Sequence, residues 1–326
     1  MPKGRRAQAA RIILVSNSLS TWNRKCLPDI HAVLKKYPEV VHFEGENVKK
    51  LYKQLKAFRD TSPELLILNG GDGTIHTALT YIINKKIFKE MPPLAILGGG
   101  MTNMIARDLN TGEKASVALE KILACHSDIG CHEKTKERRL IRVNVEGKKK
   151  TEYGLFFGSG SLVNVIRYCT RRLYTLGIKG KSAQVVAVFL YYLSRAFRWG
   201  RPGTLGYSPL MTIRLDNGKI VRGKFSSLAA TTLHRLIFGS KAPVGHAGFP
   251  FYTLGPSFWA MVISLVRGAR GTIDKTKSKW ITLDYTKKAV IEESYPFTLD
   301  GEIFKVKKGR SITLTHTKPY KFVSFN

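Results

Sequence analysis

The segment Leu65-Leu66-Ile67-Leu68-Asn69-Gly70-Gly71-Asp72-Gly73-Thr74 joins an apolar run to a glycine-rich turn. The apolar residues at 65–68 predict a fully buried strand of a parallel sheet. The glycines permit a turn, and an approach to a ligand, that are too close for residues with a Cβ atom. Thr74 can cap the helix that follows, and the first N–H groups of that helix form an anion site. The segment therefore predicts a strand, an anion-binding turn and a helix.

Asp72 is the unexpected residue of this turn, because a carboxylate repels a phosphate group directly. A carboxylate in this position is better suited to act through Mg²⁺ or on an acceptor hydroxyl. The alternative interpretation is a structural cap in an ordinary strand-to-helix turn, since glycine-rich turns of that kind are common. In both interpretations Asp72 is part of the turn.

Strands alternate with helices around this segment. Further buried strands are predicted at residues 12–15, 40–43 and 94–97, and a helix is predicted at 75–87. This spacing is typical of βαβ units and a parallel sheet, on which ligands bind at the carboxyl ends of strands. The loops at residues 16–21, 70–74 and 98–103 all follow strands. Three polar or glycine-rich loops are therefore expected to converge on one site.

The pattern changes beyond Gly112, where alternating strands dominate. The turn Asp216-Asn217-Gly218 between two such strands is a strong hairpin signal. We therefore predict an α/β domain with a parallel sheet over residues 1–127. A mainly antiparallel β domain with inserted helices is predicted over residues 128–326.

The charge of the chain is extreme, with 54 Lys and Arg against 23 Asp and Glu, a net +31. So large a positive charge favours partners with dense negative charge, such as an anionic membrane, nucleic acid or polyphosphate. The four cysteines form no C-x-x-C pair, which favours a reducing compartment and predicts a cytoplasmic protein. The apolar runs are shorter than the roughly 20 residues that span a bilayer, so no membrane span is predicted.

Three motifs together resemble the bacterial lipid kinases related to diacylglycerol and sphingosine kinases. They are Gly70-Gly71-Asp72-Gly73-Thr74, the turn Gly100-Met101-Thr102-Asn103, and Asp300-Gly301-Glu302. The resemblance covers nearly the whole chain. It implies an α/β nucleotide-binding domain at 1–127 that uses ATP and Mg²⁺, and a β-sandwich lipid-acceptor domain at 128–326.

The resemblance also implies roles for individual residues. Asp72 would lie beside the transferred phosphoryl group and its Mg²⁺, and either Glu302 or Asp300 would accept a proton from the lipid hydroxyl. The nucleotide-binding residues implied by the motifs are Asn17, Gly70, Gly71, Gly73, Thr74, Gly100, Thr102 and Asn103. The implied reaction is transfer of the γ-phosphoryl of ATP to a diacylglycerol or sphingoid-type acceptor.

Basic residues at helical spacing, beside aromatic residues, predict that region 160–201 contacts an anionic membrane surface. These residues are Arg167, Arg171, Arg172, Arg195, Arg198 and Arg201. The expected enzyme is therefore peripherally bound to the inner face of the membrane. Nucleic acid is disfavoured as a partner because no DNA- or RNA-binding motif is present, and the sequence leaves a homodimer open.

Two alternatives stay open at this point. An NAD kinase-like enzyme shares the first glycine motif. A catalytically degenerate kinase could serve as a module that binds membranes or nucleic acid, because the chain departs from the family pattern at several positions. Met101 replaces a threonine, His76 replaces an asparagine, and the loop after Asn17 lacks a proline and a glycine.

Overall fold

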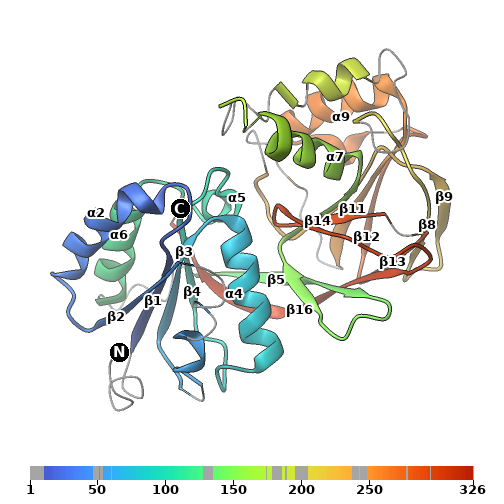
Figure 1. The fold of residues 1–326 in the computed structure, drawn as a ribbon. Helices are drawn as coiled ribbons and strands as arrows, with labels where there is room; N and C mark the ends of the chain where they lie inside the picture. Colours follow the sequence, from blue (N-terminus) through green and yellow to red (C-terminus); the bar gives the residue numbers. More distant parts are fainter. Residues whose placement is uncertain are drawn as a thin grey trace. The chain divides into compact units, whose positions relative to one another are not determined.

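The computed structural model of the chain is shown in Figure 1. It describes residues 11–325 except 47–50, 52–53, 60, 128–134, 174, 178–185, 188, 195–204, 237–241, 243–247, 277 and 294. The chain forms two compact units. Unit 1 is Met1–Arg139 with Lys318–Asn326, and unit 2 is Leu140–Thr317. The prediction of two consecutive domains did not include this return of the C-terminal residues to unit 1.

Unit 1 is built on a parallel sheet. Its strands are β1 (Ile12–Asn17), β2 (Val40–Gly45), β3 (Leu65–Gly70) and β4 (Leu94–Gly98), in the order β2-β1-β3-β4. All three pairings between them are parallel, and near the chain's end Phe322 pairs with Leu94 in the same sense. The predicted α/β fold with a parallel sheet is confirmed.

Helices cover both faces of this sheet (Figure 1). They are α2 (Asn23–Leu34), α4 (Asp72–Lys85), α5 (Met104–Asp108) and α6 (Ala115–Ser127). Helices α2 and α6 share a hydrophobic core with alternate strand residues such as Leu14, Ile67 and Leu97. Burial of both faces explains why these strands are continuous apolar runs rather than alternating ones.

Unit 2 is a β-sandwich. One sheet is antiparallel, in the order β12-β11-β10-β7-β14-β15. Its strands are β7 (Phe156–Gly160), β10 (Ser227–Thr231), β11 (Phe249–Leu254), β12 (Ile281–Thr286), β14 (Phe297–Leu299) and β15 (Glu302–Phe304). The other strands are β5 (Thr135–Val145), β6 (Glu152–Gly154), β8 (Leu210–Leu215), β9 (Ile220–Lys224), β13 (Lys288–Glu292) and β16 (Ile312–Val323). Strands β5 and β16 each have residues in both units.

A hydrophobic core lies between the two groups of strands in unit 2. Phe157, Phe251 and Phe297 come from the antiparallel sheet, while Ile213 and Leu314 come from the other strands, and all are fully buried. The predicted hairpin between β8 and β9 forms, with Gly218 at φ +81°. The predicted mainly antiparallel β-sandwich is therefore confirmed.

Helices are inserted between the strands of unit 2, as predicted. They are α7 (Ser161–Tyr168), a π-helical turn (Cys169–Leu173) and α9 (Phe258–Arg270). None of the helices in the described parts of the chain is long and apolar enough to cross a membrane.

Candidate functional site

Three loops meet where the strands of unit 1 end. The side-chain amide of Asn17, after β1, donates to Thr74 Oγ1 at 2.8 Å. The backbone N–H of Gly99, after β4, donates to the carbonyl of Gly70 at 2.9 Å. The loops at 16–21, 70–74 and 98–103 are thus joined directly, as their positions after neighbouring parallel strands require.

The glycines of two of these loops allow their backbones to pack on each other. A Cβ atom on Gly100 would lie 2.5 Å from Gly71 Cα, and one on Gly99 would lie 2.2 Å from Asn23 Oδ1. Neither glycine has a positive φ. These positions therefore need glycine for space rather than for an unusual backbone conformation.

Helix α4 begins directly at the glycine turn. Its N-cap is Gly71 in an extended conformation, with no side-chain cap. The prediction that Thr74 caps this helix is wrong, because Thr74 lies inside its first turn. Its N–H donates to the Gly71 carbonyl and its hydroxyl accepts from Asn17. The first N–H groups of a helix lack intrahelical partners and carry its positive dipole end, so the start of α4 suits a phosphate group.

Asp72 connects the first glycine turn to the second. Its two carboxylate oxygens accept the backbone N–H groups of Met104 and Ile105, each at 3.1 Å, at the start of α5. Burial raises the pKa of Asp72. These two amides and the charge of Arg107 oppose that rise.

The arrangement of Asp72 also bears on Mg²⁺. Asp72 is a residue of intermediate exposure, and its carboxylate accepts the backbone N–H groups of Met104 and Ile105. The two oxygens of a carboxylate offer about four acceptor positions, so the group keeps acceptor capacity beyond these two bonds. Mg²⁺ keeps several of its waters when it binds a protein beside phosphates. Asp72 therefore fits a contact to a hydrated Mg²⁺, which would neutralise charge on the phosphates.

The second glycine turn is held by its own asparagine. Asn103 adopts a left-handed conformation with φ +49°, and its Oδ1 accepts the N–H of Gly100 at 2.7 Å. Thr102 and Met101 are partly exposed beside it. Asn103 thus shapes the turn on which the predicted nucleotide-binding residues Gly100 and Thr102 lie.

Two buried asparagines contact the strand ends from which the loops begin. Asn23 donates through Nδ2 to the carbonyls of Asn17, at 2.8 Å, and Asn69, at 3.3 Å. Both Asn23 and Asn69 are fully buried. Sequence reasoning missed Asn23. The signal that could have indicated its role is a polar residue at the first position of a helix that follows one of the converging loops.

The acidic motif in unit 2 is a hairpin turn. Asp300 and Gly301 have φ values of +49° and +88° between β14 and β15, as a type I′ turn requires. Asp300 is 2% exposed, and its carboxylate accepts the N–H groups of Leu155 and Phe156 at 2.8–3.1 Å. Glu302 is exposed. Within this motif, Glu302 is the carboxylate that a substrate can reach.

Comparison with known proteins identifies the first part of the chain. Residues 10–129 match the family described as the diacylglycerol kinase catalytic domain. No curated protein sequence matches the chain. Similar solved structures include a diacylglycerol kinase from Bacillus anthracis str. Sterne, at 14% identity with 97% of each chain covered and a TM-score of 0.64.

Two further structures of proteins assigned as diacylglycerol kinases from the same organism also resemble the chain. Both are 15% identical, with 97% and 98% of each chain covered and TM-scores of 0.65 and 0.66. These structures show that the fold is shared. The segment that carries all three converging loops, residues 10–129, belongs to the diacylglycerol kinase catalytic domain family, a family of kinases.

Proposed function

We propose that the protein is a lipid kinase that transfers the γ-phosphoryl of ATP to a hydroxyl of a membrane lipid, of diacylglycerol or sphingoid type. The observation that carries this proposal is the convergence of three loops at the start of α4, within the kinase family match. Phosphoryl transfer depends mainly on positioning and charge stabilisation, which such loops supply.

The nucleotide side of the reaction belongs to unit 1. The first N–H groups of α4 bind phosphate oxygens, and the close packing of Gly71 on Gly100 holds the second turn beside them. Asp72 fixes the start of α5 and would hold a hydrated Mg²⁺, an ion that would supply charge neutralisation at the phosphates. Asn17 orients Thr74 through its side-chain amide.

The acceptor side of the reaction uses Glu302. Its exposed carboxylate takes the proton of the lipid hydroxyl as that oxygen bonds to the γ-phosphorus and the bond from this phosphorus to ADP breaks. Asp300 holds the hairpin in place, because its own oxygens accept backbone amides. Of the two carboxylates that the sequence offered for this role, the structure supports Glu302.

An exposed apolar surface supports action on a membrane lipid. Helix α9 exposes four apolar side chains, with Arg267 and Arg270 in its last turn. These side chains are Trp259, Ile263, Leu265 and Val266, and that of Trp259 is 71% exposed. Aromatic and aliphatic residues beside arginines suit the interface of an anionic membrane.

The region predicted from the sequence for membrane contact is described only in part. Arg171 and Arg172 are exposed, whereas Arg195, Arg198 and Arg201 lie outside the described residues.

We expect Trp259→Ala to weaken sedimentation with anionic vesicles several-fold. Trp22→Ala, at an exposed tryptophan of unit 1, is the matched control and should bind as the wild type does.

The proposed reaction is tested by transfer of labelled γ-phosphate from ATP–Mg²⁺ to a total lipid extract in anionic vesicles. A labelled lipid should form with the wild type and with Glu90→Gln, an exposed carboxylate elsewhere. It should be lost with Glu302→Gln. Label in NAD, added as the acceptor in a parallel reaction, without label in lipid would indicate an NAD kinase. Vesicle binding without any transfer would indicate a degenerate kinase.

A further inference from the structure

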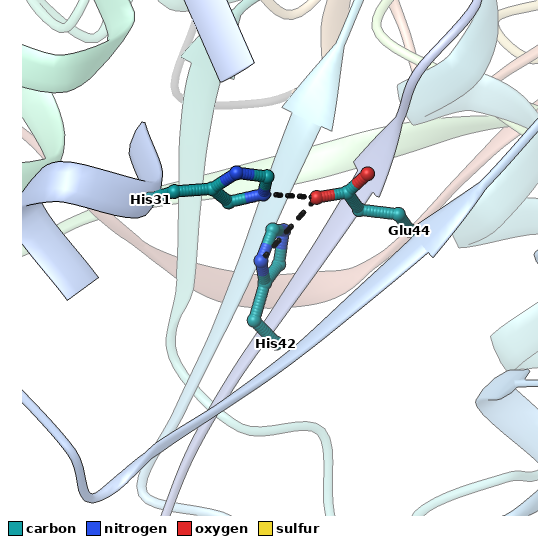
Figure 2. A group of neighbouring side chains, drawn as sticks. All are labelled: His31, His42 and Glu44. Atoms are coloured by element: carbon teal, nitrogen blue, oxygen red, sulfur yellow. Dashed lines mark hydrogen bonds and ion pairs between the residues drawn. The ribbon is translucent and has the colours of Figure 1, made fainter. Parts of the chain in front are cut away.

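A cluster of two histidines and a glutamate lies on unit 1 (Figure 2). It consists of His31 on α2 with His42 and Glu44 on β2. Glu44 Oε1 contacts His31 Nε2 and lies 3.8 Å from His42 Nδ1. One ligand atom of each residue lies within 4.8 Å of the other two.

The fold explains why these three residues meet. His42 and Glu44 are two apart on a strand, so their side chains point to the same face of the sheet. Strand β2 pairs in parallel with β1, and helix α2 covers that face through Ile30 and Val33. His31 follows Ile30 directly, which places it at the border of the buried face and half-exposed beside the strand.

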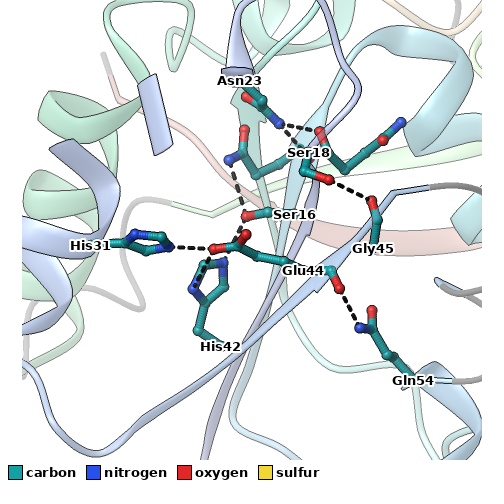
Figure 3. Close-up of polar contacts among 10 residues, drawn as sticks. Ser16, Ser18, Asn23, His31, His42, Glu44, Gly45 and Gln54 are labelled. Atoms are coloured by element: carbon teal, nitrogen blue, oxygen red, sulfur yellow. Dashed lines mark hydrogen bonds and ion pairs between the residues drawn. The ribbon is translucent and has the colours of Figure 1, made fainter. Parts of the chain in front are cut away.

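Hydrogen bonds behind the cluster hold the ring of His42 (Figure 3). Its Nε2 lies 2.9 Å from Ser16 Oγ, which also accepts from Asn69 Nδ2 at 3.1 Å. Ser16 and Asn69 are fully buried. An imidazole whose second nitrogen is held in this way presents its other nitrogen in a defined direction, as in many metal sites.

The state of His42 is compatible with a ligand role. Burial lowers the pKa of His42 to about 4, with Glu44 opposing the effect and His31 adding to it. The side chains of His31 and Glu44 are 50% and 36% exposed, so an ion can reach the cluster from solvent.

We propose that His31, His42 and Glu44 bind a divalent transition metal of the zinc class through His31 Nε2, His42 Nδ1 and a Glu44 carboxylate oxygen. Two imidazole nitrogens and one carboxylate suit Zn²⁺, whereas Mg²⁺ prefers oxygen ligands. Tetrahedral bonds of about 2.0 Å separate ligand atoms by roughly 3.3 Å, so small side-chain movements complete the site. The fourth position is open to water.

The position of this metal site connects it to the kinase loops. From His42, hydrogen bonds continue through Ser16 to Asn69, whose carbonyl accepts from Asn23, and Asn23 in turn donates to Asn17. Asn17 bonds Thr74 in the glycine turn. A metal on His42 would therefore bind at one end of a chain of hydrogen bonds that reaches the predicted nucleotide site.

The test is direct binding of Zn²⁺ to the full chain, measured by calorimetry and by competition with a chelating dye. We expect one equivalent to bind the wild type, and at least tenfold weaker binding by His31→Gln and by Glu44→Gln. Both substituted side chains are partly exposed, and circular dichroism confirms their folding. His126→Gln is the matched control, because His126 pairs with Glu64 at 3.3 Å without a second histidine in that pair.

Substitution with Co²⁺ adds a spectroscopic test of the ligands. The proposed site predicts visible d–d bands of a nitrogen and oxygen site, without the near-ultraviolet charge-transfer band that cysteine ligation produces. These bands should disappear in His31→Gln and persist in His126→Gln. Wild-type binding that His31→Gln leaves unchanged would overturn the proposal, as would a cysteine charge-transfer band.

Discussion

The glycine turn at 70–74 and the acidic turn at 300–302 each contain an aspartate followed by glycine, yet they differ in exposure. Asp72 and Asp300 both accept two backbone N–H groups from a neighbouring segment. Asp300 is fully buried, whereas Asp72 is partly exposed beside the start of α4. Asp300 therefore mainly connects its hairpin to Leu155 and Phe156 through hydrogen bonds. Asp72 connects two segments in the same way and also lies beside the predicted phosphate site.

The largest stability effect is expected for Asp300→Ala. The N–H groups of Leu155 and Phe156 lose their acceptor in a buried position, and each unsatisfied donor costs roughly 1–3 kcal/mol. The free energy of unfolding in urea should fall by about 4 kcal/mol. Asp300→Asn keeps an acceptor oxygen and tolerates a positive φ, so it should lose about half as much. A loss below about 1 kcal/mol in the alanine variant would argue against the claim that these hydrogen bonds stabilise the fold.

A smaller loss, of about 2 kcal/mol, is expected for Asp72→Ala. Asp72 is a residue of intermediate exposure, whereas Asp300 is 2% exposed, so we expect water to compensate for part of the lost hydrogen bonding at Asp72. Removal of the carboxylate also removes the cost of burying its negative charge, which is the effect that raises the pKa of Asp72. This gain reduces the expected loss. The same urea titration measures the loss, with Glu39→Ala as an exposed control. Equal losses at Asp72 and Asp300 would remove the contrast between the two turns.

Gly100→Ala tests the close packing of the nucleotide loops. The new Cβ atom would lie 2.5 Å from Gly71 Cα, a backbone atom that cannot rotate away. Overpacking of this kind costs about 2 kcal/mol and should also weaken ATP binding, measured by calorimetry. Unchanged ATP affinity would show that the two turns do not act together in binding.

Gly301→Ala tests the opposite requirement for glycine. No atom lies within 4 Å of the added Cβ, but the backbone has φ +88°. The strain of this conformation in alanine should cost about 1 kcal/mol in the urea titration. A cost that exceeds that of Gly100→Ala would reverse the distinction between glycine for space and glycine for conformation.

Much of unit 1 could be predicted because its information is local. Apolar runs such as 65–68 indicate buried parallel strands, and loops after such strands must share one edge of the sheet. The partners of Asp72 could not be predicted, because they are backbone amides at 104 and 105 that carry no side-chain signal. The cluster of His31, His42 and Glu44 likewise depends on the position of α2 over β2, which periodicity does not specify.

The roles within the acidic turn were left open by the sequence for a similar reason. Asp300 and Glu302 are equal candidates as a pattern of letters. Only the hairpin geometry shows that one side chain points into the protein and accepts amides while the other is exposed. The choice between Asp300 and Glu302 as the proposed proton acceptor therefore needed the burial of each side chain, which a motif does not encode.

The most direct test of the proposed chemistry is the kcat for lipid phosphorylation by Glu302→Gln, with its unfolding free energy measured on the same sample. An exposed substitution should change stability by less than about 0.5 kcal/mol. Loss of a general base should lower kcat by roughly 100-fold or more. That result would place the chemistry on Glu302. A folded Glu302→Gln with wild-type kcat would contradict the account and return the role of proton acceptor to Asp300.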